Sequence, residues 1–196
     1  MSDFDAQQYW QSETNSHLEV ANLTKEQLYT PFQAVLDACY TSITNGNKIM
    51  FFGNGGSAAD AQHLATELSV RFIKDRPPIA ALALTTDTST LTAAGNDMGF
   101  DNIFSRQIDA IGQTGDIAIG ISTSGNSPNV MNALKTAHEK KIITIGLSGR
   151  DGGGMPDLCD HMLIIPSDIT ARIQEMHILL GHMLCGALEQ KLGLST

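Results

Sequence analysis

The stretch Lys48-Ile49-Met50-Phe51-Phe52-Gly53-Asn54-Gly55-Gly56-Ser57 decides the fold of this chain. Its first half is short and apolar, as is typical of a buried strand, and residues 58–70 have the pattern of a helix. A glycine-rich turn between a strand and a helix directs backbone N–H groups and the helix N-terminus toward one point. The sequence therefore predicts a phosphate-binding turn at residues 53–57.

The alternation of strand and helix continues along the chain. The apolar patterns predict strands at 49–52, 79–84, 116–121, 142–147 and 161–165, and helices at 57–70, 88–94, 104–111, 129–140 and 170–192. Alternating order implies parallel strands with helices on both faces. We therefore expect an α/β fold over residues 46–196: a three-layer αβα sandwich with a five-stranded parallel sheet, of the flavodoxin-like type.

The first 45 residues differ, because they contain no convincing strand. They have the pattern of two helices, at 4–22 and 25–45. A helical arm of this length cannot pack entirely on a small sheet, so we expect its apolar side to be buried against another subunit. The sequence predicts a single domain over residues 1–196 and a homo-oligomer built through the arm.

Composition argues against several classes of protein. The 196 residues carry a net charge of −9, whereas a general nucleic-acid binder would more often be basic. No apolar run approaches the ~20 residues of a membrane span, and the acidic N-terminus lacks the layout of a signal peptide. We expect a cytoplasmic protein with no nucleic-acid or membrane partner. Its cysteines have no Cys-x-x-Cys spacing, and Cys39 and Cys185 are predicted to be reduced core residues.

A second candidate loop is rich in hydroxyl groups: Ser122-Thr123-Ser124-Gly125-Asn126-Ser127. It lies between a predicted strand and a predicted helix, and hydroxyl and N–H groups can hold a phosphate without a lysine. Ser122, Thr123 and Ser124 are predicted to bind a ligand, and Ser127 is placed to cap the helix, with Pro128 at its first position. Since both loops follow parallel strands, they should open on the same edge of the sheet.

The glycine turn also fits the loose dinucleotide fingerprint G-x-G-x-x-[GA], which is weak evidence alone. That fingerprint needs an acid at the end of the second strand, and here the acid, Asp87, comes late. A nicotinamide-dependent oxidoreductase is therefore an alternative, but a sugar phosphate fits two serine-bearing loops better.

Acid–base and metal-binding chemistry is suggested at two places. His63 and Glu67 are four residues apart and share a helix face. Near the C-terminus, Gln174 and His182 are eight apart, about 80° around a helix, and could border one face. His177 is an equally allowed partner of Gln174, and spacing does not choose between the two histidines. A further pair, Asn96 and Asp97, could bond sugar hydroxyls or form an ordinary turn.

Taken together, these pieces resemble the phosphoheptose isomerase family of the sugar-isomerase (SIS) domain superfamily. The matching segments run from about residue 46 to 190 and are Gly53–Ser57, His63–Glu67, Ala94–Asp97, Ile121–Ser127, Gly149–Gly153 and Arg172–His177 with His182. The set is specific, although any one piece would not be.

The resemblance implies an isomerase that interconverts sedoheptulose 7-phosphate and D-glycero-D-manno-heptose 7-phosphate, the first step toward the heptose of bacterial surface glycans such as lipopolysaccharide. It implies Glu67 as the general base and His182 as the general acid, which settles the choice between His182 and His177. It also implies one Zn²⁺ per subunit, held by His63, Glu67, Gln174 and His182. The implied contacts to the substrate are Asn54, Gly55, Gly56, Ser57, Glu67, Asn96, Asp97, Ser122, Thr123, Ser124, Ser127 and Gln174.

Family members are tetramers with active sites shared between subunits, which the resemblance extends to this chain. Some members carry an Asp where this chain has Ala171, so any polar role at that position is lost or supplied elsewhere. Arg71 falls where the family has an arginine near the phosphate. Close relatives that bind a replication initiator and are not enzymes share parts of these motifs. The non-enzymatic alternative is disfavoured because Glu67 and His182 are both present.

Overall fold

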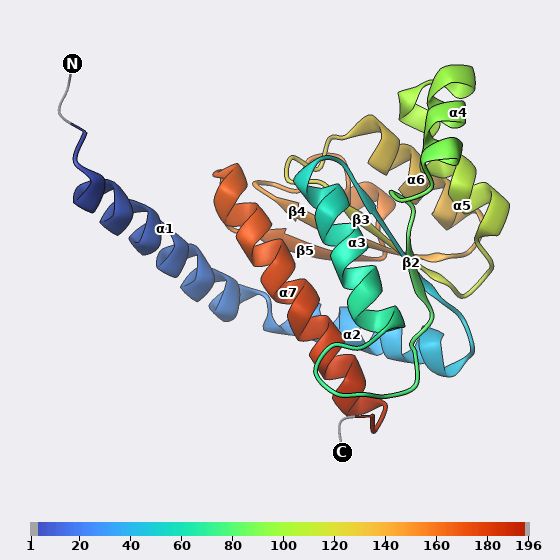
Figure 1. Cartoon of the computed structure of the whole chain (residues 1–196), viewed down its shortest axis with the longest axis horizontal. Helices are drawn as coiled ribbons and strands as arrows, with labels where there is room; N and C mark the ends of the chain where they lie inside the picture. The colour runs from blue at the N-terminus through green and yellow to red at the C-terminus, as the bar shows by residue number, and fades with distance from the viewer. Residues whose placement is uncertain (1–3, 195–196) are drawn as a thin grey trace.

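Five parallel strands lie between two layers of helices in the computed structural model, which describes residues 4–194 (Figure 1). The strands are β1 (Ile49–Gly53), β2 (Ala81–Ala83), β3 (Ile117–Ile121), β4 (Ile143–Gly149) and β5 (His161–Ile165). Their order in the sheet is β2-β1-β3-β4-β5. This is the flavodoxin-like order, so the predicted fold class is confirmed, and the order reverses between β1 and β3.

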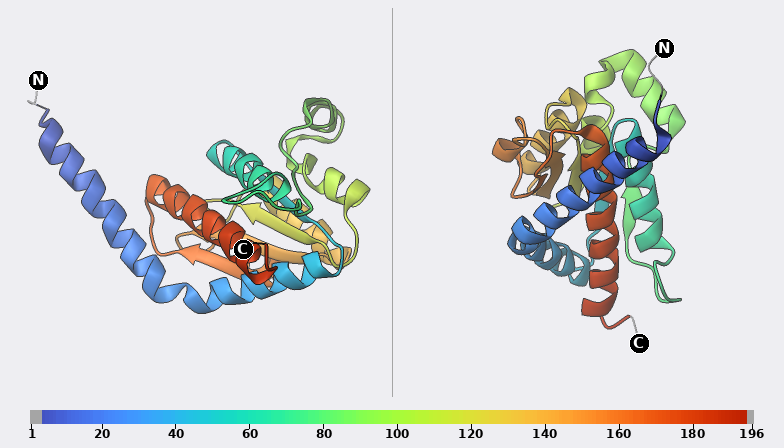
Figure 2. Two further views of the ribbon diagram at one scale, coloured as in Figure 1. Left: turned by 60° about the horizontal axis from the view of Figure 1, so that its bottom comes forward. Right: turned by 90° about the vertical axis from the view of Figure 1, so that its left-hand side faces the viewer.

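The two faces of the sheet are covered by different helices (Figure 2). Helices α2 (Tyr29–Thr44), α3 (Gly56–Ser69) and α7 (Thr170–Lys191) pack on one face, and α4 (Thr88–Met98), α5 (Ser105–Ile111) and α6 (Pro128–Glu139) on the other. Short 3₁₀ helices occur at Phe100–Asn102 and Pro156–Leu158. Successive strand residues point to opposite faces. Phe51 therefore joins the first core while Met50 and Phe52 join the second.

The N-terminal region forms two helices, as expected, but the break between them was predicted too early. Helix α1 (Ala6–Gln27) continues through the predicted break at residues 23–24 and ends before Leu28. Val20, Thr24 and Leu28 are spaced by four and are all buried, so one packed stripe carries the helix across this segment. The N-terminal end of α1 projects away from the sheet (Figures 1 and 2).

Two other predicted boundaries also moved. The helix expected at 88–94 continues to Met98 and ends at Gly99, whose φ of 85° suits glycine. The strand expected at 79–84 shrinks to Ala81–Ala83, because the N–H of Ile79 donates to the carbonyl of Leu68 instead of to a strand.

Between residues 4 and 194, no helix has the length and apolar character needed to cross a bilayer. Cys39 and Cys185 are buried free thiols, as predicted, and burial raises the pKa of each to about 12.

Candidate functional site

The glycine turn and the serine loop leave the sheet side by side. Gly53 at the end of β1 is paired with Ile121 at the end of β3, so the next residues of both strands emerge at the same level. Adjacent strands are separated by only ~4.8 Å. The edge predicted from sequence is therefore formed at the point where the strand order reverses, which is where open α/β sheets bind ligands.

The glycine turn is shaped by close packing and leaves backbone donors free. A Cβ at Gly53 would lie 2.7 Å from the carbonyl oxygen of Ile121, and Gly55 has a φ of 56°. Within residues 4–194, the N–H groups of Gly55 and Gly56 donate to no protein acceptor, whereas the N–H of Ser57 donates to Asn54. Gly55 and Gly56 are exposed, so the turn presents two unpaired N–H groups to an anion.

The side chain of Asn54 is already occupied. Its amide exchanges two hydrogen bonds with the amide of Asn129, at 2.8 and 2.9 Å, and Asn129 is buried at the start of α6. This reciprocal pair ties the glycine turn to the helix that follows the serine loop. Residue Asn129 was not singled out from sequence, because no local pattern indicates a partner 75 positions away.

In the serine loop, the predicted capping role of Ser127 is wrong. Ser127 does occupy the N-cap position of α6 with Pro128 after it, but its hydroxyl makes no capping bond. It pairs instead with the hydroxyl of Ser122 at 2.9 Å. The loop is supported by residues 149–154, since the N–H of Gly154 donates to the carbonyl of Gly125. Thr123 and Ser124 are partly exposed at the rim.

The predicted acid–base residues meet in one place. Nε2 of His63 lies 2.8 Å from Nε2 of His182 and 3.4 Å from Oε1 of Glu67. His63 and Glu67 come from α3 and His182 comes from α7, 119 positions away from His63. A carboxylate and an imidazole therefore flank a third side chain, and the Glu67 side chain is 19% exposed, which leaves it accessible.

Helices α3 and α7 run parallel, and glycines allow their close approach. A Cβ at Gly56 would lie 2.7 Å from Nε2 of Gln174, so that side chain rests on the glycine turn. Further along the same two helices, a Cβ at Gly181 of α7 would lie 2.5 Å from Cδ2 of Leu64 on α3. Gln174 and His182 therefore border one face of α7, as their spacing suggested, and that face is turned toward α3.

The other candidate histidine is a core residue. His177 is fully buried and its Nε2 lies 3.1 Å from the carbonyl oxygen of Ser148. Burial lowers its pKa from 6.5 to about 4. The structure thus separates His177 from His182, which spacing could not do.

Three further candidate residues have clear positions. Asn96 and Asp97 lie in the last turn of α4 and are exposed, and the amide of Asn96 donates to Asp97 at 2.7 Å. Within the described chain, neither side chain hydrogen-bonds to the glycine turn, the serine loop or the histidine pair. Asp87, the late acid of the dinucleotide fingerprint, caps α4 by accepting from the N–H of Thr90, and this bond lowers its pKa.

The metal-capable residues fit zinc chemistry without forming a complete cage. Over residues 4–194, no three His, Cys, Asp or Glu side chains already enclose a point that could hold a metal ion. Tetrahedral zinc places two nitrogen ligands about 3.3 Å apart, given Zn–N distances near 2.05 Å. A small opening of the His63–His182 contact would give that spacing, with Glu67 and Gln174 on the same helix pair.

Two more residues near the pair were missed in the sequence. Asp60 is one turn before His63, and its pKa is raised by burial while the nearby His63 and His182 lower it. Phe72 stacks on His182 with ring centroids 5.5 Å apart and 26° between the planes. The spacing of three between Asp60 and His63 could have indicated that the two side chains are neighbours, whereas no sequence pattern indicates the contact between Phe72 and His182.

Comparison with known proteins finds a family model and close relatives that match this chain. The profile of the SIS domain family matches residues 13–149. A phosphoheptose isomerase from Paramagnetospirillum magneticum is 57% identical over 88% of this chain and 90% of its own length. Phosphoheptose isomerase 2 from Campylobacter jejuni is 59% identical over 76% of this chain and 74% of its own.

Solved structures of phosphoheptose isomerases are also similar to this chain. A phosphoheptose isomerase from Neisseria gonorrhoeae superposes with a TM-score of 0.90 at 43% identity, covering 95% of this chain and all of that one. One from Francisella tularensis superposes with a TM-score of 0.92 at 36% identity over the same shares. The chain belongs to the phosphoheptose isomerase family of SIS-domain proteins.

Proposed function

We propose that this protein isomerises sedoheptulose 7-phosphate to D-glycero-D-manno-heptose 7-phosphate. Membership of the phosphoheptose isomerase family makes it an isomerase of sugar phosphates. The observation that carries the proposal is the meeting of His182 with Glu67 and His63, which lie on a helix that begins at the glycine turn. The same observation disfavours the two alternatives, a cofactor-dependent oxidoreductase and a non-enzymatic initiator-binding protein.

Proton transfer between C1 and C2 is the chemistry that this site supports. The carboxylate of Glu67 takes a proton from C1 of the ketose, while His182 donates one to the oxygen on C2, and a cis-enediol results. His182 then takes the proton from the oxygen on C1, and Glu67 returns its proton to C2. Each such acid–base role contributes ~10²–10⁴-fold to the rate.

The phosphate group gives binding energy away from the reacting carbons. The proposed contacts are the free N–H groups of Gly55 and Gly56 and the hydroxyls of the serine loop. The glycine turn begins α3, and His63 lies seven residues beyond Gly56 along that helix, which is ~10 Å at 1.5 Å per residue. A seven-carbon chain that separates its phosphate from C1 and C2 suits a site of this length, and binding at one end orients the other.

Zinc is the proposed cofactor, one per subunit, held by His63, Glu67, Gln174 and His182. When bound, it would act as a Lewis acid toward the substrate oxygens. Two imidazoles and a carboxylate are typical zinc ligands, although an amide oxygen is not. Metal analysis of the purified protein tests this: we expect about one zinc per chain, and less than a tenth of that in His63→Ala.

Shared active sites in a homotetramer are also proposed. Asn96, Asp97 and Arg71 are exposed side chains outside the histidine cluster of the same chain. A neighbouring subunit would bring such residues to the substrate, while α1 supplies the contact between subunits.

The test of the function is direct. The purified protein is incubated with sedoheptulose 7-phosphate and the sugars are followed by NMR. We expect an aldose 7-phosphate to appear and to reach equilibrium with the ketose. Persistence of the ketose alone, in protein that binds zinc and is folded, would refute the proposal.

A further inference from the structure

One face of α7 beyond His182 receives the loop that follows α3. His182, Gly186 and Glu189 are spaced by four and three residues, so they share that face. The segment that lies on it, residues 70–78, is here called the α3–β2 loop. All three α7 residues contact this loop.

The ring of Phe72 covers the first two positions. It stacks on the imidazole of His182, and it also lies over Gly186, where a Cβ would be 3.3 Å from Cε1 of Phe72. That distance is tighter than most Cβ contacts in proteins. The bare backbone at Gly186 therefore lets the ring lie flat along α7 beside the imidazole.

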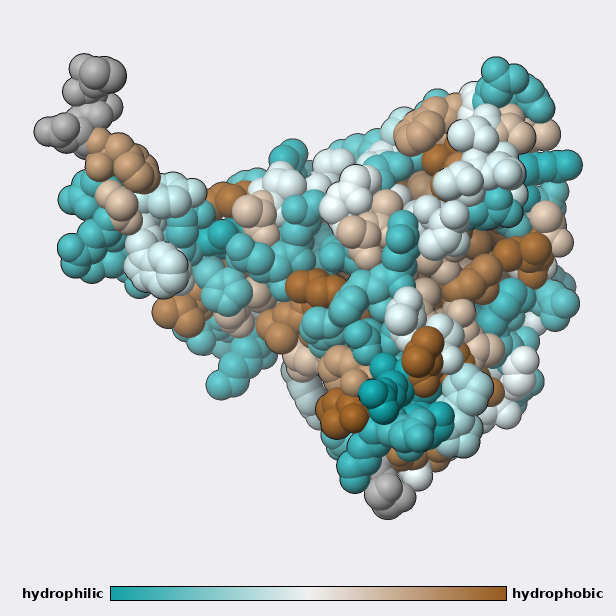
Figure 3. All heavy atoms as spheres, in the orientation of Figure 1, coloured by the Kyte–Doolittle hydropathy of each residue, from teal (hydrophilic) through white to brown (hydrophobic). Residues whose placement is uncertain are grey.

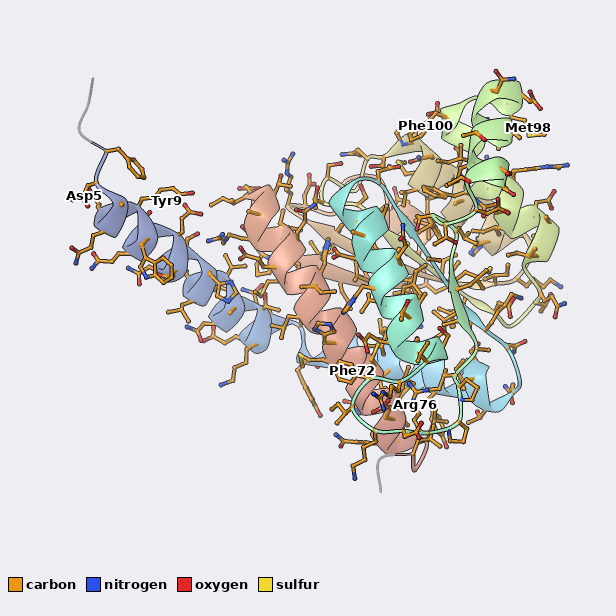
Figure 4. The ribbon with its side chains drawn as sticks, viewed as in Figure 1. Asp5, Tyr9, Phe72, Arg76, Met98 and Phe100 are labelled. Atoms are coloured by element: carbon orange, nitrogen blue, oxygen red, sulfur yellow. The ribbon has the colours of Figure 1, made fainter. Side chains whose placement is uncertain are left out.

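Glu189 holds the backbone of the same loop. Its Oε1 accepts the N–H of Phe72 at 3.1 Å and the Nε–H of Arg76 at 2.7 Å. The side chains of Arg76 and Glu189 are each only 1% exposed, so the ion pair is buried. Figure 4 shows Phe72 and Arg76 together on this loop, at the end of α3 and beside α7.

Arg76 also connects this end of α7 to α3. Its two terminal nitrogens donate to the carbonyl oxygens of Leu68 and Glu67, each at 2.8 Å. These are carbonyls of the last turn of α3, which a helix end leaves without intrahelical partners. One guanidinium thus bonds to the backbone of Glu67 and to a side chain seven residues after His182.

A buried ion pair is a poor source of net stability, because removing two charges from water costs about as much as their attraction returns. Its geometry is nevertheless strongly restricted, since a misplaced partner leaves a buried charge unpaired. An imidazole without a neighbour on its face has a broad χ2 distribution. The arrangement therefore restrains a side chain that would otherwise rotate.

We propose that Phe72 is a positioning residue for the isomerisation: the buried Arg76–Glu189 pair holds its ring against His182 and so fixes the imidazole that faces His63 and Glu67. The part of this inference that concerns activity rests on the proposed function. Misplacement of a reacting group by about 1 Å can cost up to ~10²-fold in rate.

The test replaces Phe72 with Leu, which keeps an apolar side chain and removes the aromatic face. Isomerisation kinetics and NMR of ¹³C-histidine-labelled protein are measured together, with His182→Gln to assign the ring signal. We expect kcat to fall at least tenfold with KM within twofold, and the His182 ring protons to move downfield as the ring current is lost. Phe72→Tyr should restore both quantities.

Ile73→Ala is the matched control, because Ile73 is on the same loop and is 69% exposed. It should leave kcat and the His182 signal at wild-type values. Wild-type kcat and an unmoved His182 signal in Phe72→Leu would overturn the inference. Failure of the proposed function would look different: the wild-type protein would not isomerise the sugar, while the His182 signal would still respond to Phe72→Leu.

The role of the Arg76–Glu189 ion pair is tested by the double variant Arg76→Met/Glu189→Leu, which removes both charges together. If the pair holds the ring, the His182 signal should move in the same direction as in Phe72→Leu. A wild-type His182 signal in this variant would show that the ion pair does not position Phe72.

Discussion

His177 and His182 stand five residues apart on α7 and have opposite environments. His177 is buried under β4, whereas His182 faces α3 and its partner His63. The difference arises from which face of the helix meets the sheet, since His177 shares the buried stripe of Ile173 and Leu180. Burial makes the neutral form of His177 the stable one in the folded protein.

This burial predicts a loss of stability in mild acid. The folded pKa of His177 is about 4 and the unfolded value is 6.5, so the unfolded state binds more protons between these values. The stabilisation is present above pH 6.5, weakens as pH falls, and is gone below pH 4. At pH 5 the loss from this residue is ~2 kcal/mol.

Urea unfolding at pH 7 and pH 5 measures the effect, with His177→Gln as the variant that cannot titrate. The wild-type protein should lose more unfolding free energy between the two pH values than the variant. Equal losses in both proteins would mean that His177 is not buried in its neutral form.

Spacing alone indicated some of the site residues and could not indicate others. His63 and Glu67 follow from a separation of four on one helix, and the serine loop follows from its composition. The resemblance favours His182 over His177, whereas the spacing from Gln174 allows both. Only burial in the folded protein separates the two histidines. Asn129 and Phe72 act through contacts with distant residues, and no local pattern contains that information.

At the level of elements, the parallel packing of α3 on α7 brings His63, Glu67 and His182 together. Small residues set the distance between the two helices: Gly181 faces Leu64, and Gly56 faces Gln174. Strand positions were predictable because continuous apolar runs of this length are typical of buried parallel strands. The ends of helices were harder to predict from the sequence. Helix α4 passes through Gly95 to Gly99, and α1 passes through residues 23–24, since packing outweighs local propensity.

Gly181→Ala is predicted to disturb this packing. The added Cβ would lie 2.5 Å from Leu64, so α7 must shift away from α3 or Leu64 must change rotamer. Overpacking of this kind costs ~1–3 kcal/mol. We expect a lower melting temperature and a fall in kcat, because His63 and His182 are carried by the two helices that separate.

Gly95→Ala is the control within a helix, since its Cβ would meet only a methyl group of Ile103 at 3.9 Å. Gly95→Ala should leave the melting temperature unchanged or raise it, because Ala is favoured over Gly inside a helix by ~1 kcal/mol. A melting temperature of Gly181→Ala equal to that of Gly95→Ala would contradict the packing account.

For the whole molecule, the exposed aromatic residues of α1 are the outstanding feature. Tyr9 and Trp10 are 57% and 70% exposed, on a helix that extends beyond the sheet. Figure 3 shows scattered apolar side chains among hydrophilic ones on this arm, and Figure 4 places Tyr9 far from the sheet. Such surface on a projecting helix is typical of a contact between protein chains. The chain order of elements was predictable, but the direction of α1 was not, because no local pattern specifies how a helix leaves the rest of the molecule.

Light scattering is expected to give a mass near that of four 21.0 kDa chains. Trp10→Glu should lower the mass by at least half, because a charge would replace apolar surface at the contact. Gln11→Glu adds the same charge at the neighbouring position and should keep the wild-type mass. A wild-type protein that runs as a 21.0 kDa monomer would refute the tetramer.

The central claim is that Glu67 moves the substrate proton at a site where His182 completes the transfer. Isomerisation in D₂O, with NMR at C2 of the product, tests it in the wild-type protein and in Glu67→Gln. The account predicts rapid incorporation of deuterium at C2 by the wild-type protein. It predicts at least a hundredfold slower exchange by Glu67→Gln, which should still bind the sugar phosphate. Exchange by Glu67→Gln at near wild-type rate would contradict it.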